Sequence, residues 1–297
     1  MNPAKVLVMG GVTYDELVYL ETLPPPISNT VFSHRYHETV GGTGAGKALN
    51  LNRLFQTVTF HALIGDDWRG RAVREVFATE KLNFVAEIDP KGTERHINLM
   101  ETSGGRVSIY VTYATFEPSI DMAHVNDLIA SHDVVALNII NYCRFVIPTI
   151  KAQGRPIWCD IHDYDGKSAY HQGFVDAADY LFLSSDRLPD YGPFMQAQIG
   201  QGKRLVVCTH GKKGATALTA DGQWFEVAAL DYPQVDTNGA GDSFFAGVLY
   251  GYMGGQPIEK CLRFGTIAAG LTITSPDLFS PMLSPEKLQA EYAERYA

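Results

Sequence analysis

The sequence predicts an α/β protein built around a parallel sheet, and two observations support this fold class. Short apolar runs rich in β-branched residues alternate along the chain with segments whose apolar residues recur at helical spacing. The first of these runs is ended by glycines and has the pattern of a strand buried on both faces. The expected core strands are 5–11, 58–64, 133–137, 156–160, 180–183 and 205–209.

The remaining elements follow in order from the N-terminus. Residues 13–40 turn polar and aromatic and contain three consecutive prolines, so this stretch is not expected to belong to the core. Its last part, 31–40, resembles a partly exposed strand. Residues 96–113 predict a hairpin around the turn 103–106, and we expect this hairpin to pair with 31–40.

Two kinds of helix are expected beside these strands. A glycine loop at 41–46 leads directly into an amphipathic helix that carries Ala48 and Phe55 on its apolar face. Near the C-terminus, 239–252 and 258–274 carry small and apolar residues at helical spacing, with Gly or Pro at their ends. Helices of this kind can cover both faces of a parallel sheet.

Composition excludes several classes of function. With 297 residues, of which 45% are hydrophobic, the chain can bury a sizeable core. A formal net charge of -9 disfavours nucleic acid and anionic membranes as partners. The four cysteines form no Cys-x-x-Cys pair, and the apolar run at 6–9 is too short for a signal peptide or a membrane span. We expect a cytoplasmic protein.

One glycine-rich segment, 235–247, carries the clearest chemical signal. Its small residues let backbone N–H groups converge on an anion where a helix begins, which is typical of a phosphate site. Asp242 lies in the first turn beside these groups, where it could accept a proton from a hydroxyl that attacks the phosphate. Taken alone, Gly-Ala-Gly-Asp also fits a glycine turn capped by acidic residues.

Three motifs together resemble the ribokinase or PfkB-type carbohydrate kinase family. The string Asp-Thr-x-Gly-Ala-Gly-Asp at 236–242 is similar to the C-terminal signature of that family. The glycine loop 41–46 resembles its N-terminal Gly-Gly motif, and Asp15 matches its early Asp. Residues 209–214 resemble its Thr-x-Gly-x-x-Gly loop. The resemblance extends over nearly all of the chain.

The resemblance implies a single kinase domain, 1–297, with a ribokinase-like three-layer α/β/α sandwich and a small β-sheet lid. The lid would be built from about 12–40 and 93–116 and would exclude water during transfer. The implied activity is transfer of the γ-phosphate of ATP to a hydroxyl of a small sugar, with Mg²⁺ as cofactor. Asp242 is the implied catalytic base, and the backbone of Gly239, Ala240 and Gly241 would stabilise the phosphoryl group.

Further site residues are expected from the matched motifs and from polar residues near them. Arg95 on the hairpin and Asn138 after a core strand are candidate contacts, although exposed strands and turns commonly carry such residues. The expected substrate-binding residues are Asp15, Gly41, Gly42, Thr43, Arg95 and Asn138. The expected nucleotide-binding residues are Thr209, Gly211, Gly214, Asn238 and Thr266.

The sequence departs from the family pattern at two places. Gly46 stands where the family often has Asn, and Ser185-Asp-Arg-Leu188 replaces the Asn-x-x-Glu found near the phosphates in many relatives. Asp186 or Asp160 could instead orient hydrated Mg²⁺ through water. Asp236 resembles a ligand of the monovalent cation in some relatives, which makes K⁺ a further candidate cofactor.

Other interpretations were weighed against these motifs. Residues 41–48 nearly spell a P-loop, but Ala48 has no hydroxyl for magnesium, so Lys47 is expected to be a solvated helix residue. The acidic stretch 160–166 lacks the spacing of a calcium loop and fits a polar loop. A nucleoside kinase of the same fold and a catalytically silent sugar- or nucleotide-binding regulator remain alternatives. The resemblance also suggests a homodimer formed through the lid.

Overall fold

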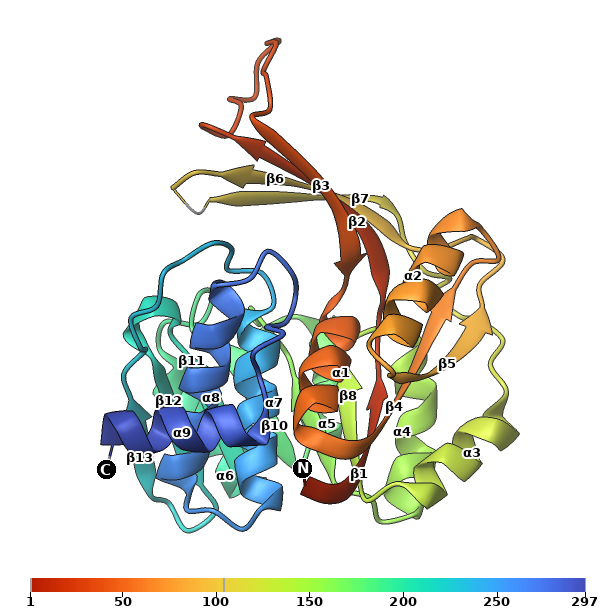
Figure 1. Cartoon of the computed structure of the whole chain (residues 1–297). Coiled ribbons are helices and arrows are strands. Elements are labelled where there is room, and N and C mark those ends of the chain that lie inside the picture. Colours follow the sequence, from red (N-terminus) through yellow and green to blue (C-terminus); the bar gives the residue numbers. More distant parts are fainter. Residues whose placement is uncertain (1, 104, 297) are drawn as a thin grey trace.

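The computed structural model describes residues 2–103 and 105–296, and its central element is a nine-stranded sheet (Figure 1). The strand order is β13-β12-β11-β10-β9-β8-β1-β4-β5. Neighbouring strands from β5 to β11 are parallel, and β12 and β13 extend the sheet in antiparallel fashion. The strands are β1 Asn2–Met9, β4 Phe55–Ile64, β5 Asn83–Ile88, β8 Val134–Asn138, β9 Ile157–Asp160, β10 Tyr180–Ser184, β11 Leu205–Thr209, β12 Ala215–Thr219 and β13 Trp224–Val227.

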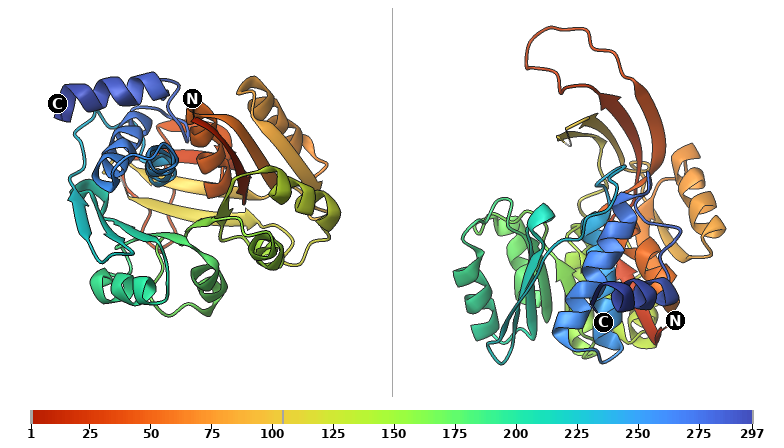
Figure 2. Two further views of the ribbon diagram at one scale, coloured as in Figure 1. Left: turned by 90° about the horizontal axis from the view of Figure 1, so that it is seen from below. Right: turned by 60° about the vertical axis from the view of Figure 1, so that its left-hand side comes forward.

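Helices cover both faces of this sheet and bury it (Figures 1 and 2). Along β1, Val6 and Val8 enter the core on one face, whereas Leu7 and Met9 enter the core on the other. This alternation explains why the run lacks polar residues. The helices are α1 Thr43–Leu54, α2 Trp68–Thr79, α3 Met122–Ser131, α4 Tyr142–Ala152, α5 Ala169–Ala177, α6 Tyr191–Gly200, α7 Ala240–Met253, α8 Ile258–Ile273 and α9 Pro285–Tyr296.

A second sheet of four strands, here called the lid, projects from the core (Figure 1). Its order is β3-β2-β6-β7, with β2 Thr13–Leu20, β3 Arg35–Gly41, β6 Arg95–Glu101 and β7 Arg106–Thr112. The predicted fold class, a three-layer α/β/α sandwich with a β-sheet lid, is therefore confirmed. Among the described helices, none combines the length and the apolar character needed to cross a membrane.

The pairing inside the lid differs from the prediction. The hairpin of β6 and β7 was expected beside residues 31–40, but β6 pairs in parallel with β2, and β2 in turn pairs with β3. β2 was not predicted, because its residues are mostly polar or aromatic and form no apolar run. Leu17 and Leu20 nevertheless anchor it in the interior. The expected turn at 103–106 includes residue 104, which lies outside the described residues.

The glycine loop places the start of α1 against the end of β1. Gly42 has a φ of 90°, which favours glycine, and a Cβ on Gly44 would lie 2.6 Å from the carbonyl oxygen of Gly11. The Ala45 N–H donates to that same oxygen at 3.2 Å. This close approach brings the N-terminus of α1 to the edge of the sheet where the parallel strands end.

Candidate active site

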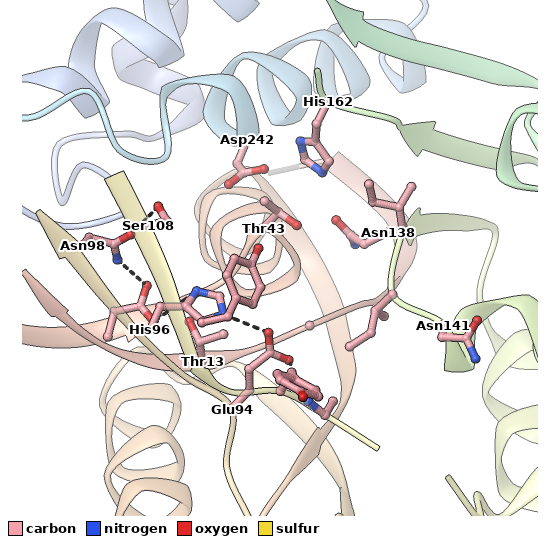
Figure 3. A pocket seen from close by; sticks show the side chains of 18 of the residues that line it. Thr13, Thr43, Glu94, His96, Asn98, Ser108, Asn138, Asn141, His162 and Asp242 are labelled. Carbon is pink, nitrogen blue, oxygen red and sulfur yellow. Dashed lines mark hydrogen bonds and ion pairs between the residues drawn. The ribbon is translucent and has the colours of Figure 1, made fainter. Parts of the chain in front are cut away.

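A cavity of about 570 Å³ lies between the lid and the carboxyl ends of the parallel strands. Its lining includes Asp15 from the lid, Gly42 and Thr43 from the glycine loop, Asn138 from the end of β8 and Asp242 from α7. Figure 3 shows Thr43, Asn138 and Asp242 around one space, with Asp242 opposite the lid residues. The carboxyl edge of an open α/β sheet is the usual position of a ligand site.

The start of α7 carries the glycine turn that the sequence predicts as an anion cradle. Gly239 has a φ of 78°, and a Cβ there would lie 2.3 Å from the carbonyl oxygen of Leu278, so the turn requires glycine. Apart from its chain neighbours and the backbone of its own helix, no described atom lies within 4 Å of the position that a Cβ on Gly241 would take. Ala240 N–H donates to Thr237 at 3.3 Å. The open space at Gly241 is suited to an anion at a helix N-terminus.

Asp242 lies beside this cradle and is almost fully buried. Its Oδ1 accepts a hydrogen bond from Lys47 Nζ at 2.5 Å, and the same ammonium group lies 3.1 Å from Asp160 Oδ2. Burial raises the pKa of Asp242 above its ordinary value, and the Lys47 charge opposes that rise. Burial alone would also raise the pKa of Asp160, but His162 and Lys47 lower it to about 2.

The expectation that Lys47 is a solvated helix residue is wrong. Its side chain is 1% exposed, because α1 is buried on every side from Gly44 to Leu51 and not on one face alone. Burial would lower the pKa of Lys47, but the Asp160 and Asp242 carboxylates raise it above its ordinary value, so the group is a cation. α1 is covered by α7 as well as by the sheet. This contact depends on the whole topology, so no local sequence pattern indicates it.

The lid contributes a connected polar group to the cavity. Asn98 Nδ2 donates to Asp15 Oδ2 at 3.2 Å, and Ser108 Oγ donates to Asn98 Oδ1 at 2.6 Å. Asp15 Oδ1 and the amide oxygen of Asn138 are buried and accept no hydrogen bond from the described residues. Both residues line the cavity. His96 Nδ1 lies 3.7 Å from Asp15 Oδ1, which is too far for a hydrogen bond, so both oxygens can accept from a ligand that carries hydroxyl groups.

The structure overturns the prediction that Arg95 binds substrate. Arg95 forms an ion pair with Glu16, with Nη2 at 2.5 Å from Oε1, and does not line the cavity. The neighbouring His96 faces the cavity, because successive residues of a strand point to opposite sides. The lid guanidinium that lines the cavity is Arg106, which the sequence analysis did not select. Strand alternation counted from Asn98 and Ser108 could have identified it.

The expected nucleotide residues lie in three places. Thr209 ends β11, and Gly211 begins the 3₁₀ turn Gly211–Lys213. Gly214 requires glycine there, because a Cβ would lie 1.9 Å from the Val227 carbonyl oxygen. Asn238 lines the first cavity instead, and Thr266 on α8 donates its hydroxyl to the Arg263 carbonyl.

A second cavity of about 650 Å³ lies beside this turn, between β12 and the chain after β10. Ser185, His210, Lys213, Thr216 and Glu226 are among the residues that line it. His210 Nδ1 lies 3.0 Å from Ser185 Oγ, and His210 Nε2 lies 2.9 Å from Thr216 Oγ1. These contacts join the turn to the segment that departs from the Asn-x-x-Glu pattern.

The described residues contain no group of three or more His, Cys, Asp or Glu side chains arranged to hold a metal ion. Of the expected metal residues, Asp186 is exposed and Asp160 is paired with Lys47. Asp236 uses both carboxylate oxygens within the protein, accepting from Asn238 N–H at 2.8 Å and from Tyr19 Oη at 2.8 Å. The described residues therefore do not fit a divalent metal held by side chains alone.

The fold and the site define a class: a kinase for small molecules, with an anion cradle and a buried carboxylate under a β-sheet lid. Comparison with known proteins shows the family. The chain matches the pfkB family of carbohydrate kinases over residues 4–284 and belongs to it. It is thus a phosphotransferase with an alcohol acceptor that phosphorylates a sugar-like compound, and kinases of this family use ATP.

Two relatives are similar over almost the whole chain. An acarbose 7(IV)-phosphotransferase from Actinoplanes sp. is 31% identical over 280 residues, covering 91% of this chain and 92% of that protein. The solved structure of a microbiome-derived acarbose kinase is 30% identical, with a TM-score of 0.87 over 98% of this chain and 99% of that one. The ribokinase of Arabidopsis thaliana, solved with ribose and ATP, shares the fold at 19% identity, with a TM-score of 0.80 over 97% of this chain and 98% of that one.

Proposed function

We propose that the protein transfers the γ-phosphate of ATP to a hydroxyl of a saccharide, with Asp242 as the general base. The observation that carries this proposal is the position of Asp242, in the first turn of α7 between the cavity and the open space at Gly241. An acceptor in the cavity would meet the carboxylate on one side and the phosphate on the other. General base catalysis requires this geometry.

The proposed transfer is a single displacement at the γ-phosphorus of ATP. The acceptor hydroxyl gives its proton to the Asp242 carboxylate as its oxygen bonds to the γ-phosphorus. The bond from that phosphorus to the bridging oxygen of ATP breaks, and ADP leaves. Gly239 and Gly241 would donate backbone N–H groups to the phosphoryl oxygens, which carry the charge in the transition state. Ala240 would join them by exchanging its hydrogen bond to the Thr237 carbonyl for one to the phosphoryl group.

The charges of the cavity favour an acceptor without a phosphate group. The described lining contains the carboxylates of Asp15, Glu94, Asp163 and Asp242 and one permanent cation, Arg106. An acceptor phosphate would be repelled by this set. Hydroxyl groups, in contrast, can donate to the unpaired oxygens of Asp15 and Asn138.

The size of the cavity and the nature of the relatives favour a saccharide acceptor. A volume of about 570 Å³ lies within the usual range for small-molecule sites and accommodates more than one sugar ring. Two relatives of at least 30% identity are kinases of acarbose by name, so an acarbose-like oligosaccharide is the first candidate. A nucleoside is the second, because the rings of Tyr110, Tyr113 and Phe116 line the same cavity and could stack on a base.

The nucleotide would lie along residues 209–214, where Gly211 leaves open space and Gly214 lets the turn pack against Val227. Thr266 would lie on its other side, and Asn238, which lines the acceptor cavity, would meet the phosphates. Mg²⁺ would arrive with the ATP phosphates and meet the chain through water at Asp186. The K⁺ site at Asp236 stays a prediction, and in this structure Tyr19 occupies one of its oxygens. A cytoplasmic location agrees with four cysteines that are all buried and unpaired.

ADP formation over an acceptor panel tests the proposal. Purified protein with MgATP would be offered acarbose, malto-oligosaccharides, pentoses, hexoses and nucleosides, and the products would be examined by ³¹P NMR. We expect acceptor-dependent ADP release and a phosphate monoester on a saccharide. Turnover with nucleosides alone would establish the second candidate. Tight binding without turnover of any acceptor would establish the silent regulator and contradict the proposal.

A further inference from the structure

Lys47 and its two carboxylate partners form a buried ionic cluster that the functions assigned above do not use. Lys47 Nζ lies 2.5 Å from Asp242 Oδ1 and 3.1 Å from Asp160 Oδ2, and its side chain is 1% exposed. The ammonium group also lies 5.3 Å from the ring centre of Phe245. A cation this deeply buried is costly unless it is fully paired, so its retention here calls for a role.

The two carboxylate oxygens of Asp242 have different surroundings. Oδ1 is held by Lys47, whereas no described residue donates a hydrogen bond to Oδ2. Asp242 lines the cavity, so Oδ2 is the oxygen left for an acceptor hydroxyl. A carboxylate fixed through one oxygen also presents the other in a defined orientation, which is what a general base requires.

Gly46, the residue before Lys47, is part of the same arrangement. A Cβ on Gly46 would lie 2.3 Å from Asp242 Oδ2 and 2.9 Å from Cγ of the same carboxylate. Any side chain at this position would therefore push Asp242 out of its place. Two features define where the Asp242 carboxylate lies: Gly46 has no side chain, and Lys47 supplies an ammonium group.

We propose that Lys47 is a positioning residue for Asp242, held in turn by Asp160, and that Gly46 leaves the space this arrangement needs. The proposal rests on the proposed function, since it assigns Lys47 a task only if Asp242 is the base. Lys47 contacts neither the cavity nor the anion cradle and acts through Asp242. It keeps its own proton throughout the reaction.

Asp160 is the second carboxylate beside Lys47, and it balances the Lys47 charge during the reaction. Before transfer, Lys47 carries one positive charge against two carboxylates. When Asp242 accepts the acceptor proton it becomes neutral, and Lys47 would be left as an unpaired buried cation without Asp160. With Asp160 present, a neutral ion pair remains, so the protonated state of Asp242 does not leave a charge unpaired in the interior.

The test compares Lys47→Met with a matched control, Lys203→Met. Lys203 is the other deeply buried lysine of interest, and its ammonium donates to the carbonyl oxygens of Val175 and Ala178, away from the site. We expect Lys47→Met to lower kcat by about 10- to 1,000-fold while KM for ATP and acceptor changes less than about threefold, because misplacing a reacting group costs rate more than binding. Lys203→Met should keep the wild-type kcat.

Two further variants separate the possible outcomes. Gly46→Ala keeps the Lys47 ammonium group but displaces the carboxylate that it pairs with, so kcat should fall here as well. This variant decides the matter if Lys47→Met does not fold. In the background of Asp242→Asn, adding Lys47→Met should cause no further loss of kcat, because Lys47 acts through Asp242.

The inference is overturned if folded Lys47→Met and Gly46→Ala both keep kcat within about twofold of the Lys203→Met control. It is likewise overturned if Lys47→Met lowers kcat further in the Asp242→Asn background. Failure of the proposed function looks different, since Asp242→Asn would then itself retain wild-type turnover. If Asp242→Asn is inactive but Lys47→Met is active, the positioning role of Lys47 is contradicted and the proposed function stands.

Discussion

At the scale of single residues, the setting of Asp242 comes from distant parts of the chain. Lys47, its hydrogen-bond partner, lies 195 positions earlier in the sequence. Burial raises the pKa of Asp242 above its ordinary value, and Lys47 opposes the rise without cancelling it. A raised pKa makes the carboxylate a stronger base, which suits a group that must accept a proton from an alcohol.

This shift predicts an acid limb in the pH dependence of turnover. The carboxylate is the active form, so kcat is full above the raised pKa and is lost as the pH falls through it. We expect the midpoint of the loss above about 4, the ordinary value for an aspartate. The measurement is kcat between pH 4 and 9 with circular dichroism at each pH. A kcat that stays constant down to pH 4 in folded protein would contradict the assignment.

Gly241→Ala tests the anion cradle. The added methyl group meets no protein atom within 4 Å, and alanine favours helix by about 0.5–1 kcal/mol, so the melting temperature should hold or rise. The methyl group would occupy the space assigned to the phosphoryl group, so kcat should fall at least tenfold. Gly239→Ala is the comparison, because its methyl group meets Leu278 and should destabilise the fold. An unchanged kcat in Gly241→Ala would place the phosphate elsewhere.

Sequence patterns predicted the residues whose role depends on local structure. Asp242 and its glycines lie in one turn at the start of α7, so residues 236–242, together with the other matched motifs, predicted that they lie side by side. The environment of Lys47 depends on α7, which covers α1 from the far end of the chain, and no local pattern indicates that contact. Arg95 was predicted to contact substrate, but the strand directs His96, and not Arg95, toward the cavity.

At the scale of elements, the lid is linked to the core through β2. Tyr19 Oη donates to Asp236 Oδ2 at 2.8 Å, and Asp236 Oδ1 holds the backbone of Asn238. The turn that begins the anion cradle therefore contacts the lid directly. Arg106 adds a second link, with Nη1 at 3.4 Å from Asn238 Oδ1.

Tyr19→Phe should loosen this link. Losing a hydrogen bond to a carboxylate costs about 1.5–3 kcal/mol, which corresponds to a rise of roughly 10- to 100-fold in acceptor KM if all of it stabilises the closed lid. ATP hydrolysis without acceptor should rise as water enters. Steady-state kinetics would measure both effects, with Tyr36→Phe as control, because the Tyr36 hydroxyl donates to Glu38 inside the lid. Equal effects in the two variants would rule out a link through Tyr19.

The core strands were predictable because burial on both faces makes them continuous apolar runs. β2 was not, since it mixes Asp15 and Glu16 with Leu17 and shows its strand character only through its partners β3 and β6. The lid topology likewise depends on parallel pairing between distant segments. Such pairing leaves no turn signal in the sequence.

At the scale of the whole molecule, the two faces of the β6–β7 hairpin of the lid differ in character. His96 and Asn98 pair with Tyr110 and Ser108 on the face toward the cavity. The opposite face carries an apolar set in which Val107, Ile109 and Val111 are exposed large hydrophobic residues. The full apolar set is Ile97, Leu99, Val107, Ile109 and Val111. An exposed apolar sheet face favours association with a partner surface.

The homodimer suggested by the family resemblance would cover this face. We expect sedimentation velocity to give twice the 32.7 kDa mass of the chain at micromolar concentration. Ile109→Lys should shift the protein to monomer, because it would place a charge in the apolar contact. Phe145→Lys, at an exposed hydrophobic residue on α4, should leave the dimer intact. A monomeric wild type would contradict a lid dimer.

The most direct test of the central proposal is the steady-state rate of Asp242→Asn with an acceptor identified in the panel. Asparagine keeps the size of the side chain but cannot take the hydroxyl proton. We predict that kcat falls by about 10²- to 10⁴-fold while ATP binds with its wild-type affinity. An Asp242→Asn enzyme that turns over at the wild-type rate would show that another group is the base.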